Sequence, residues 1–191
     1  TQPPPDLKTT REKSLAYWWI DGLRLALEAR CLLDAGKFGE AREVVAAFTL
    51  HGEEVSKTQA EATAGGERSA RTRAFRALEV LASDLRGRLA LAGPKAGVGT
   101  AYNWFASAAD RQQPTPMMFP PMILTPMAIR LGEYYLAANQ SKEAIETYQR
   151  ALAAFPNDMD ALLGLKTSCE KAGLAAEAAE ADRKIQDLRA Q

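Results

Sequence analysis

Apolar residues recur along this 191-residue chain with the period of an α-helix. Leu78, Leu81, Leu85 and Leu89, for example, are spaced to form a single stripe along one helix. No stretch alternates with β-branched residues over four or more positions, as a half-buried strand would. The pattern therefore predicts an all-α protein.

Glycine and proline divide this pattern into about four antiparallel helix pairs. The expected helices cover residues 11–35, 38–50, 69–91 and 95–111, followed by two further pairs over 127–155 and 158–189. Residues 1–10 contain a run of three prolines at 3–5, which is typical of a linker. Residues 51–66 have the weakest apolar pattern and end in two glycines, so we expect a mobile connection, partly helical, inside the 11–111 region. Gly36 suits a left-handed helix cap.

Proline and methionine dominate residues 112–126, which contain five prolines and are predicted to be an extended segment. The four thioethers of Met117, Met118, Met122 and Met127 could in principle bind Cu(I). In a second interpretation the segment is an exposed binding strap. We expect a third one, in which Phe119 and the methionines are buried and fill gaps between the second and third helix pairs.

Beyond this segment, small and aromatic residues recur at fixed spacing. They are Leu131, Gly132, Tyr135, Ala144, Tyr148, Ala151 and Pro156. Small residues let two helices approach closely, and aromatic rings fill the space between successive turns. A shift of 34 residues aligns Leu165, Cys169 and Ala178 with this pattern, but Asp182 stands where an aromatic residue is expected. Residues 127–191 thus resemble two tetratricopeptide-type repeats, the second degenerate, whereas residues 11–111 resemble the family more weakly.

The resemblance implies a tetratricopeptide-like α-solenoid, similar to the C-terminal part of bacterial repeat proteins of unassigned function. It further implies a non-enzymatic scaffold for protein–protein interaction, in which the concave face binds a peptide or partner helix. The residues expected to line this face are Ile129, Arg130, Glu133, Leu136, Leu163, Thr167 and Glu170. Because Ile129 and Glu133 stand where the clamp for an acidic chaperone tail has Lys and Asn, that partner is not expected. Two alternatives are a structural or oligomerising segment of a larger protein and a Cu(I)-binding protein.

Charge and chemistry narrow the function further. Lys plus Arg and Asp plus Glu both total 24, and a net charge of zero disfavours nucleic acid as a partner. His51 is the only histidine and is expected just past a helix end, so triads and multi-histidine metal sites are excluded. Cys31 and Cys169 are expected to be buried and unpaired. We therefore expect no catalysis, no cofactor and no membrane span. The sequence leaves open whether the chain forms a homo-oligomer and whether it resides in the bacterial cytoplasm or periplasm.

Overall fold

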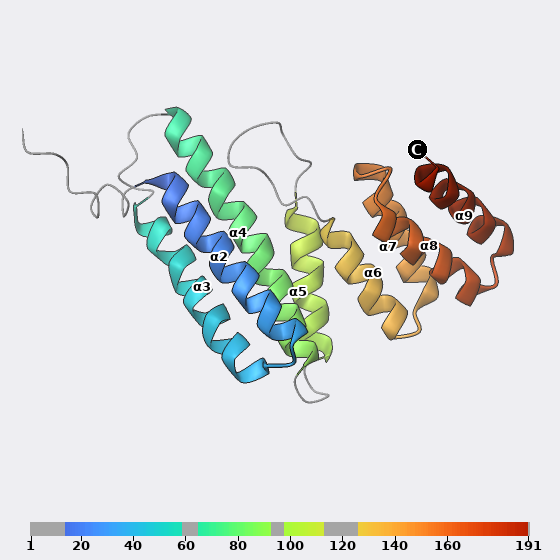
Figure 1. Cartoon of the computed structure of the whole chain (residues 1–191), viewed down its shortest axis with the longest axis horizontal. Coiled ribbons are helices and arrows are strands. Elements are labelled where there is room, and N and C mark those ends of the chain that lie inside the picture. The colour runs from blue at the N-terminus through green and yellow to red at the C-terminus, as the bar shows by residue number, and fades with distance from the viewer. Residues whose placement is uncertain (1–13, 59–64, 93–97, 113–125, 191) are drawn as a thin grey trace, which may run out of the picture.

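The computed structural model describes residues 14–58, 65–92, 98–112 and 126–190, which contain eight helices and no strand (Figure 1). The helices are α2 (Leu15–Asp34), α3 (Phe38–Thr58), α4 (Gly65–Leu91), α5 (Val98–Arg111), α6 (Met127–Ala137), α7 (Ser141–Ala154), α8 (Met159–Ala172) and α9 (Ala175–Arg189). The all-α prediction is confirmed, and the expected helix pairs are all present.

The helices form four pairs stacked along one axis (Figure 1). Within each pair the two helices pack together, as α2 does with α3 and α8 with α9. The first helices of the pairs also contact one another in sequence, α2 with α4, α4 with α6 and α6 with α8. They therefore make one continuous row, and the second helices, α3, α5, α7 and α9, make the other, as in an α-solenoid.

Three of the turns within pairs share one backbone cap. Gly36, Asn139 and Gly173 all have positive φ angles, of 72°, 59° and 75°. In each turn the next residue donates its backbone N–H, at 2.9 Å, to the carbonyl oxygen five residues earlier. This is the Schellman arrangement, which ends a helix by satisfying carbonyl groups that have lost their helical partners. The cap predicted at Gly36 is confirmed, and it turns each first helix back towards its partner.

The helix ends around residue 51 differ from the expectation. Helix α3 continues to Thr58 and α4 begins at Gly65, so much of the connection expected at 51–66 is helical. His51 lies within α3 and is half-buried, not solvated beyond a helix end. Its ring stacks on the Trp18 ring, with the ring centroids 5.3 Å apart. His51 Nε2 donates to the Trp18 carbonyl oxygen at 2.8 Å, and Trp18 Nε1 donates to the His51 carbonyl oxygen at 3.0 Å. These contacts come from α2, and therefore the local sequence could not reveal them.

Two other predictions fall mainly on residues that the structure does not describe. The linker at 1–10 lies outside the described residues, as do Phe119 and Met122, so the expected burial of the proline-rich segment stays a prediction. At the end of that segment, Pro126 and Met127 are both buried. Gln112 Oε1 accepts a hydrogen bond from the Met127 backbone N–H at 2.6 Å, which ties the end of α5 to the start of α6.

Glycine and aromatic side chains fit together between helices in more than one pair. A Cβ atom at Gly132 would lie 2.7 Å from the buried Tyr148 ring, and one at Gly164 would also clash with this ring. In the second pair, a Cβ at Gly87 would lie 2.5 Å from the Phe105 ring. The second pair therefore uses the same packing arrangement, although its sequence resembles the family only weakly.

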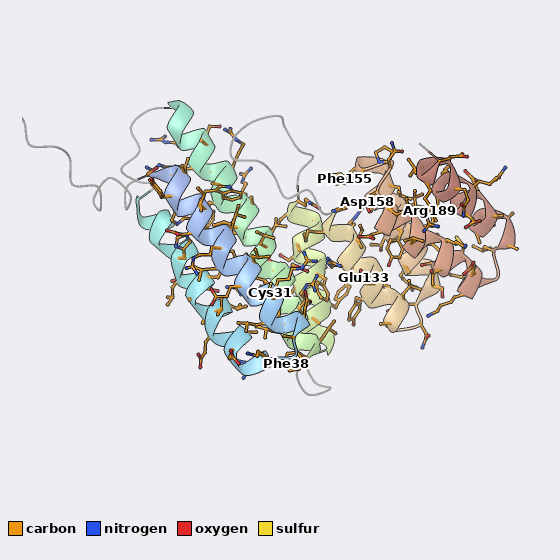
Figure 2. The ribbon with its side chains drawn as sticks, viewed as in Figure 1. Cys31, Phe38, Glu133, Phe155, Asp158 and Arg189 are labelled. Carbon is orange, nitrogen blue, oxygen red and sulfur yellow. The ribbon has the colours of Figure 1, made fainter. Side chains whose placement is uncertain are left out.

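The two cysteines lie in different environments. Both thiols are unpaired, Cys169 is buried and Cys31 is exposed. The expectation is therefore right for Cys169 and wrong for Cys31. Cys31 lies on the face of α2 that is turned away from α3 and α4, a direction that an apolar helical pattern does not specify (Figure 2).

Candidate partner-binding groove

A groove opens on the row of first helices, between α2, α4 and α6. Its volume is about 180 Å³. The lining residues are Leu23, Ala26, Leu27 and Arg30 of α2, Leu81, Asp84 and Leu85 of α4, and Met127 and Arg130 of α6. Because three successive first helices contribute, the groove exists only when these pairs are stacked.

The floor of the groove is apolar and its rim is accessible. Ala26, Leu85 and Met127 are buried, whereas Leu23 and Leu27 remain 37% and 62% exposed. Leucine side chains beside an open groove leave apolar surface in water, and covering that surface with another apolar group is favourable. The groove therefore has the composition of a binding surface for an apolar side chain.

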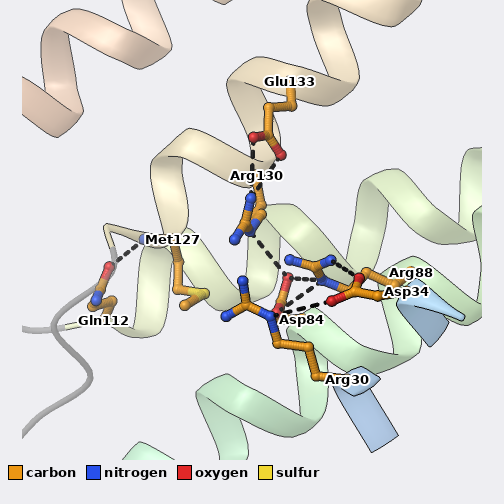
Figure 3. Close-up of polar contacts among 8 residues, drawn as sticks. All are labelled: Arg30, Asp34, Asp84, Arg88, Gln112, Met127, Arg130 and Glu133. Atoms are coloured by element: carbon orange, nitrogen blue, oxygen red, sulfur yellow. Dashed lines mark hydrogen bonds and ion pairs between the residues drawn. The ribbon is translucent and has the colours of Figure 1, made fainter. Parts of the chain in front are cut away.

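Charged groups sit at one end of the groove around the carboxylate of Asp84 (Figure 3). This side chain is only 9% exposed, and Arg88 Nε donates to both of its oxygens at 3.2 Å. Arg130 Nε lies 3.8 Å from Asp84 Oδ1, too far for a hydrogen bond. The carboxylate thus holds α4 near α6 mainly by charge, while its hydrogen bonds stay within α4.

Arg130 is the most constrained of these cations. Its Nη1 donates to both carboxylate oxygens of Glu133 at 3.0 Å, and its Nε is buried without a hydrogen-bond partner. Burial lowers the pKa of the Arg130 guanidinium, but the Glu133, Asp84 and Asp160 carboxylates raise that pKa above its usual value. Arg130 therefore stays charged, and it presents a cation at the groove together with Arg30, whose side chain is 51% exposed.

Four of the residues expected to line the concave face are on α6, and they differ in how accessible they are. Ile129 is 2% exposed and packs in the core with Tyr148, so it is not available to a partner. The structure brings Arg130 to the groove and leaves Glu133 exposed beside it. Leu136 is half-buried against the same core.

The remaining expected residues lie on α8, away from the groove. Leu163, Thr167 and Glu170 are exposed on one side of this helix. The Thr167 hydroxyl donates to the Leu163 carbonyl oxygen at 2.9 Å. Glu170 Oε1 lies 4.0 Å from Lys166 Nζ. They line none of the groove.

Most of the groove was missed because its residues come from the weakly recognised first half of the chain. In the sequence, nothing distinguishes Leu23 and Leu27 from the other apolar residues of the helix expected at 11–35. A usable signal was present, since α2 carries apolar residues on more than the one stripe that a helix at a surface needs. Which of these leucines would face a neighbouring first helix was not readable, because it depends on how the pairs stack.

The described residues contain no cluster of metal-ligating side chains and no candidate membrane-spanning helix. No group of three or more His, Cys, Asp or Glu side chains there is arranged to hold a metal ion. Three of the four clustered methionines, Met117, Met118 and Met122, lie outside the described residues. Among the described helices, none is both long and apolar enough to cross a bilayer.

Comparison with known proteins finds a family match over part of the chain. The tetratricopeptide repeat model matches residues 127–168, which are α6, α7 and most of α8. Over these residues the match confirms the resemblance to tetratricopeptide repeats drawn from the sequence. The structure is similar to the crystal structure of MamA protein, with 16% identity over 91% of this chain and 92% of that chain and a TM-score of 0.45. No curated protein matches the chain.

Proposed function

We propose that this protein is a non-enzymatic scaffold that binds a peptide or helix of another protein along its row of first helices. Tetratricopeptide repeats generally mediate protein–protein interaction. The observation that carries the proposal is the groove between α2, α4 and α6, where Leu23 and Leu27 stand exposed over an apolar floor. Packed helices form this surface before a partner binds, and a preformed surface reduces the entropy cost of association.

The partner would place an apolar side chain into the groove, with an acidic group beside it. The floor accepts the apolar side chain, and Arg30 and Arg130 offer positive charge at the same place. Both arginines already have a carboxylate neighbour, since Asp34 lies 3.8 Å from Arg30 and Glu133 accepts from Arg130 at 3.0 Å. The acidic group of the partner would therefore approach Arg30, whose side chain is 51% exposed. Complementary charge of this kind favours the correct partner over others more than it adds affinity.

Selection from a displayed random-peptide library tests the proposal directly. We expect selected peptides to combine a large apolar residue with Asp or Glu, and Leu23→Glu to weaken their binding at least about tenfold. Leu23 is on the rim, so this change places a carboxylate in the groove without removing core packing.

Leu163→Glu is the matched comparison, because Leu163 is exposed to a similar extent, 39%, on α8. Binding lost in Leu23→Glu and retained in Leu163→Glu supports the groove. The reverse result would move the binding surface to Leu163, Thr167 and Glu170, as the repeat spacing first suggested. Equal binding by both variants and the parent would contradict a site on this row of helices.

A further inference from the structure

Helix α2 exposes a second apolar stripe outside the groove. Tyr17, Ile20 and Leu27 are 47%, 57% and 62% exposed, and Arg24 and Cys31 lie between and beyond them on the same face. These five residues, here called the outer stripe, are spaced alternately three and four apart. This is the spacing of a seam between two paired helices.

The outer stripe is separate from the face that α2 uses inside its own chain. Trp19, Ala26 and Leu33 are buried against α3 and α4, on the opposite side of the helix. Only Leu27 is shared between the outer stripe and the groove. A helix with apolar side chains on two sides is expected to pack on both.

The other end of the stack is polar. In α9, Ala178, Ala181 and Ile185 are buried against α8, and no large apolar side chain of this helix is exposed. Its outward side chains include Glu180 and Lys184, which pair with each other at 3.0 Å. A polar end cannot cover an apolar one without burying charge, so the end of one chain would not stack favourably on the start of another.

We propose that the outer stripe pairs with the outer stripe of a second copy of this chain, in an antiparallel, two-fold symmetric dimer. Two-fold pairing lets each apolar face cover the other, whereas head-to-tail stacking would place it against charge. The stripe is also complementary to itself in charge, since Arg24 and Glu28 form an ion pair at 3.0 Å on its flank. In a parallel pair Arg24 would face its own copy, and antiparallel pairing instead brings it near Glu28 of the partner subunit.

The contact is small, which sets the expected affinity. The outer stripe spans 15 residues, or about 22 Å of helix, at about 1.5 Å per residue. One helix pair of this length buries less than the roughly 1,200–2,000 Å² of a standard interface, so the dimer should form only at raised concentration. Arg24 in the middle of the seam weakens it further and defines its register.

Sedimentation equilibrium of the full chain tests the proposal. The average mass should rise from one chain towards two between about 5 and about 500 µM protein. Ile20→Glu should raise the dimer dissociation constant at least about tenfold, because it places charge in the seam. Leu163→Glu serves as the exposed control and should dimerise like the parent, and equal melting temperatures show that both variants fold. A parent that stays monomeric throughout, or an Ile20→Glu variant that dimerises equally well, would overturn the proposal.

Cross-linking tests the direction of pairing. In the antiparallel register that places Arg24 opposite Leu27 of the partner subunit, Ile20 lies opposite Cys31 of the partner subunit. A short bismaleimide should therefore join Ile20→Cys to Cys31 between chains, whereas Cys169 is buried and should not react. A Cys31–Cys31 link in the parent protein would overturn the antiparallel arrangement. Ile20 does not line the groove, so Ile20→Glu should still bind groove peptides and Leu23→Glu should still dimerise.

Discussion

The third and fourth helix pairs use the same repeat positions in opposite ways. In the third pair, the Tyr148 ring packs against Gly132 so closely that a Cβ there would lie 2.7 Å away. In the fourth pair, Lys166 and Asp182 occupy the corresponding positions, 34 residues later, and form an ion pair at 2.7 Å. An apolar contact in one repeat is thus a polar contact in the next.

The neighbours of each contact explain this difference. Tyr148 is enclosed by α6 on one side and by Gly164 of α8 on the other, and is only 2% exposed. Asp182 packs beside α8 alone, and it and Lys166 keep 40% and 32% of their side chains exposed. Where another helix covers a position, an unpaired charge would be costly, and where water reaches it, an ion pair is tolerated. Asp182 is therefore suited to a position that no second helix covers.

The largest effect is expected from removing the enclosed ring. Tyr148→Ala should lower the free energy of unfolding by about 3–5 kcal/mol, because it leaves a cavity between α6 and α8. Urea denaturation measures this loss. Tyr148→Phe keeps the ring and should lose much less. If Tyr148→Ala and Asp182→Ala were equally stable, the proposed difference between the two pairs would be wrong.

Overfilling the same interface should have a somewhat smaller effect. Ala144 is fully buried, so Ala144→Phe should lower the free energy of unfolding by about 1–3 kcal/mol through forced shifts of the packed helices. Ala153 is exposed on the same helix, and Ala153→Phe controls for the change in side chain. A melting temperature that is unchanged in Ala144→Phe would show that α6 and α7 separate easily at this point.

Alkaline pH should weaken the enclosed contact. Burial raises the pKa of the Tyr148 hydroxyl above its usual value of 10.0, because the phenolate is disfavoured in the core. A raised folded-state pKa means that stability is complete below pH 10.0 and falls as the pH rises towards the folded-state pKa. Tyr148→Phe removes the titrating group, so its melting temperature should fall less between about pH 9 and pH 11. Equal falls in the two proteins would assign the effect to other groups, such as Tyr135, whose pKa burial raises to about 12.

The smallest effect is expected at the exposed ion pair. The hydrogen bond from Lys166 Nζ to Asp182 raises the pKa of Lys166, but both side chains are accessible to water and salt. Asp182→Asn should change the melting temperature far less than Tyr148→Ala, and high salt should remove the change. A large, salt-independent loss would show that this pair is as structurally important as the enclosed ring.

Local signals in the sequence were sufficient for the helices and for the last repeats. Gly36 and Gly173 end their helices by adopting φ angles that other residues rarely take, and a glycine reports this whatever surrounds it. Gly132, Ala144 and Tyr148 identify the repeat, because close helix packing restricts each position to a narrow range of sizes. These properties belong to single residues or to fixed spacings, and so the order of amino acids alone specifies them.

Only the stacked structure decided which apolar residues are covered. Ile129 and Leu27 are both aliphatic residues on first helices, yet one is 2% and the other 62% exposed. Trp18 of α2 and His51 of α3 are 33 residues apart in the sequence and form hydrogen bonds with each other. His51 is part of α3, which continues beyond its predicted end at residue 50. Such outcomes depend on which helix packs against a given face, and the packing of all the pairs together decides this. The physical reason is that the burial of a side chain depends on its neighbours in space and not on its neighbours in the chain.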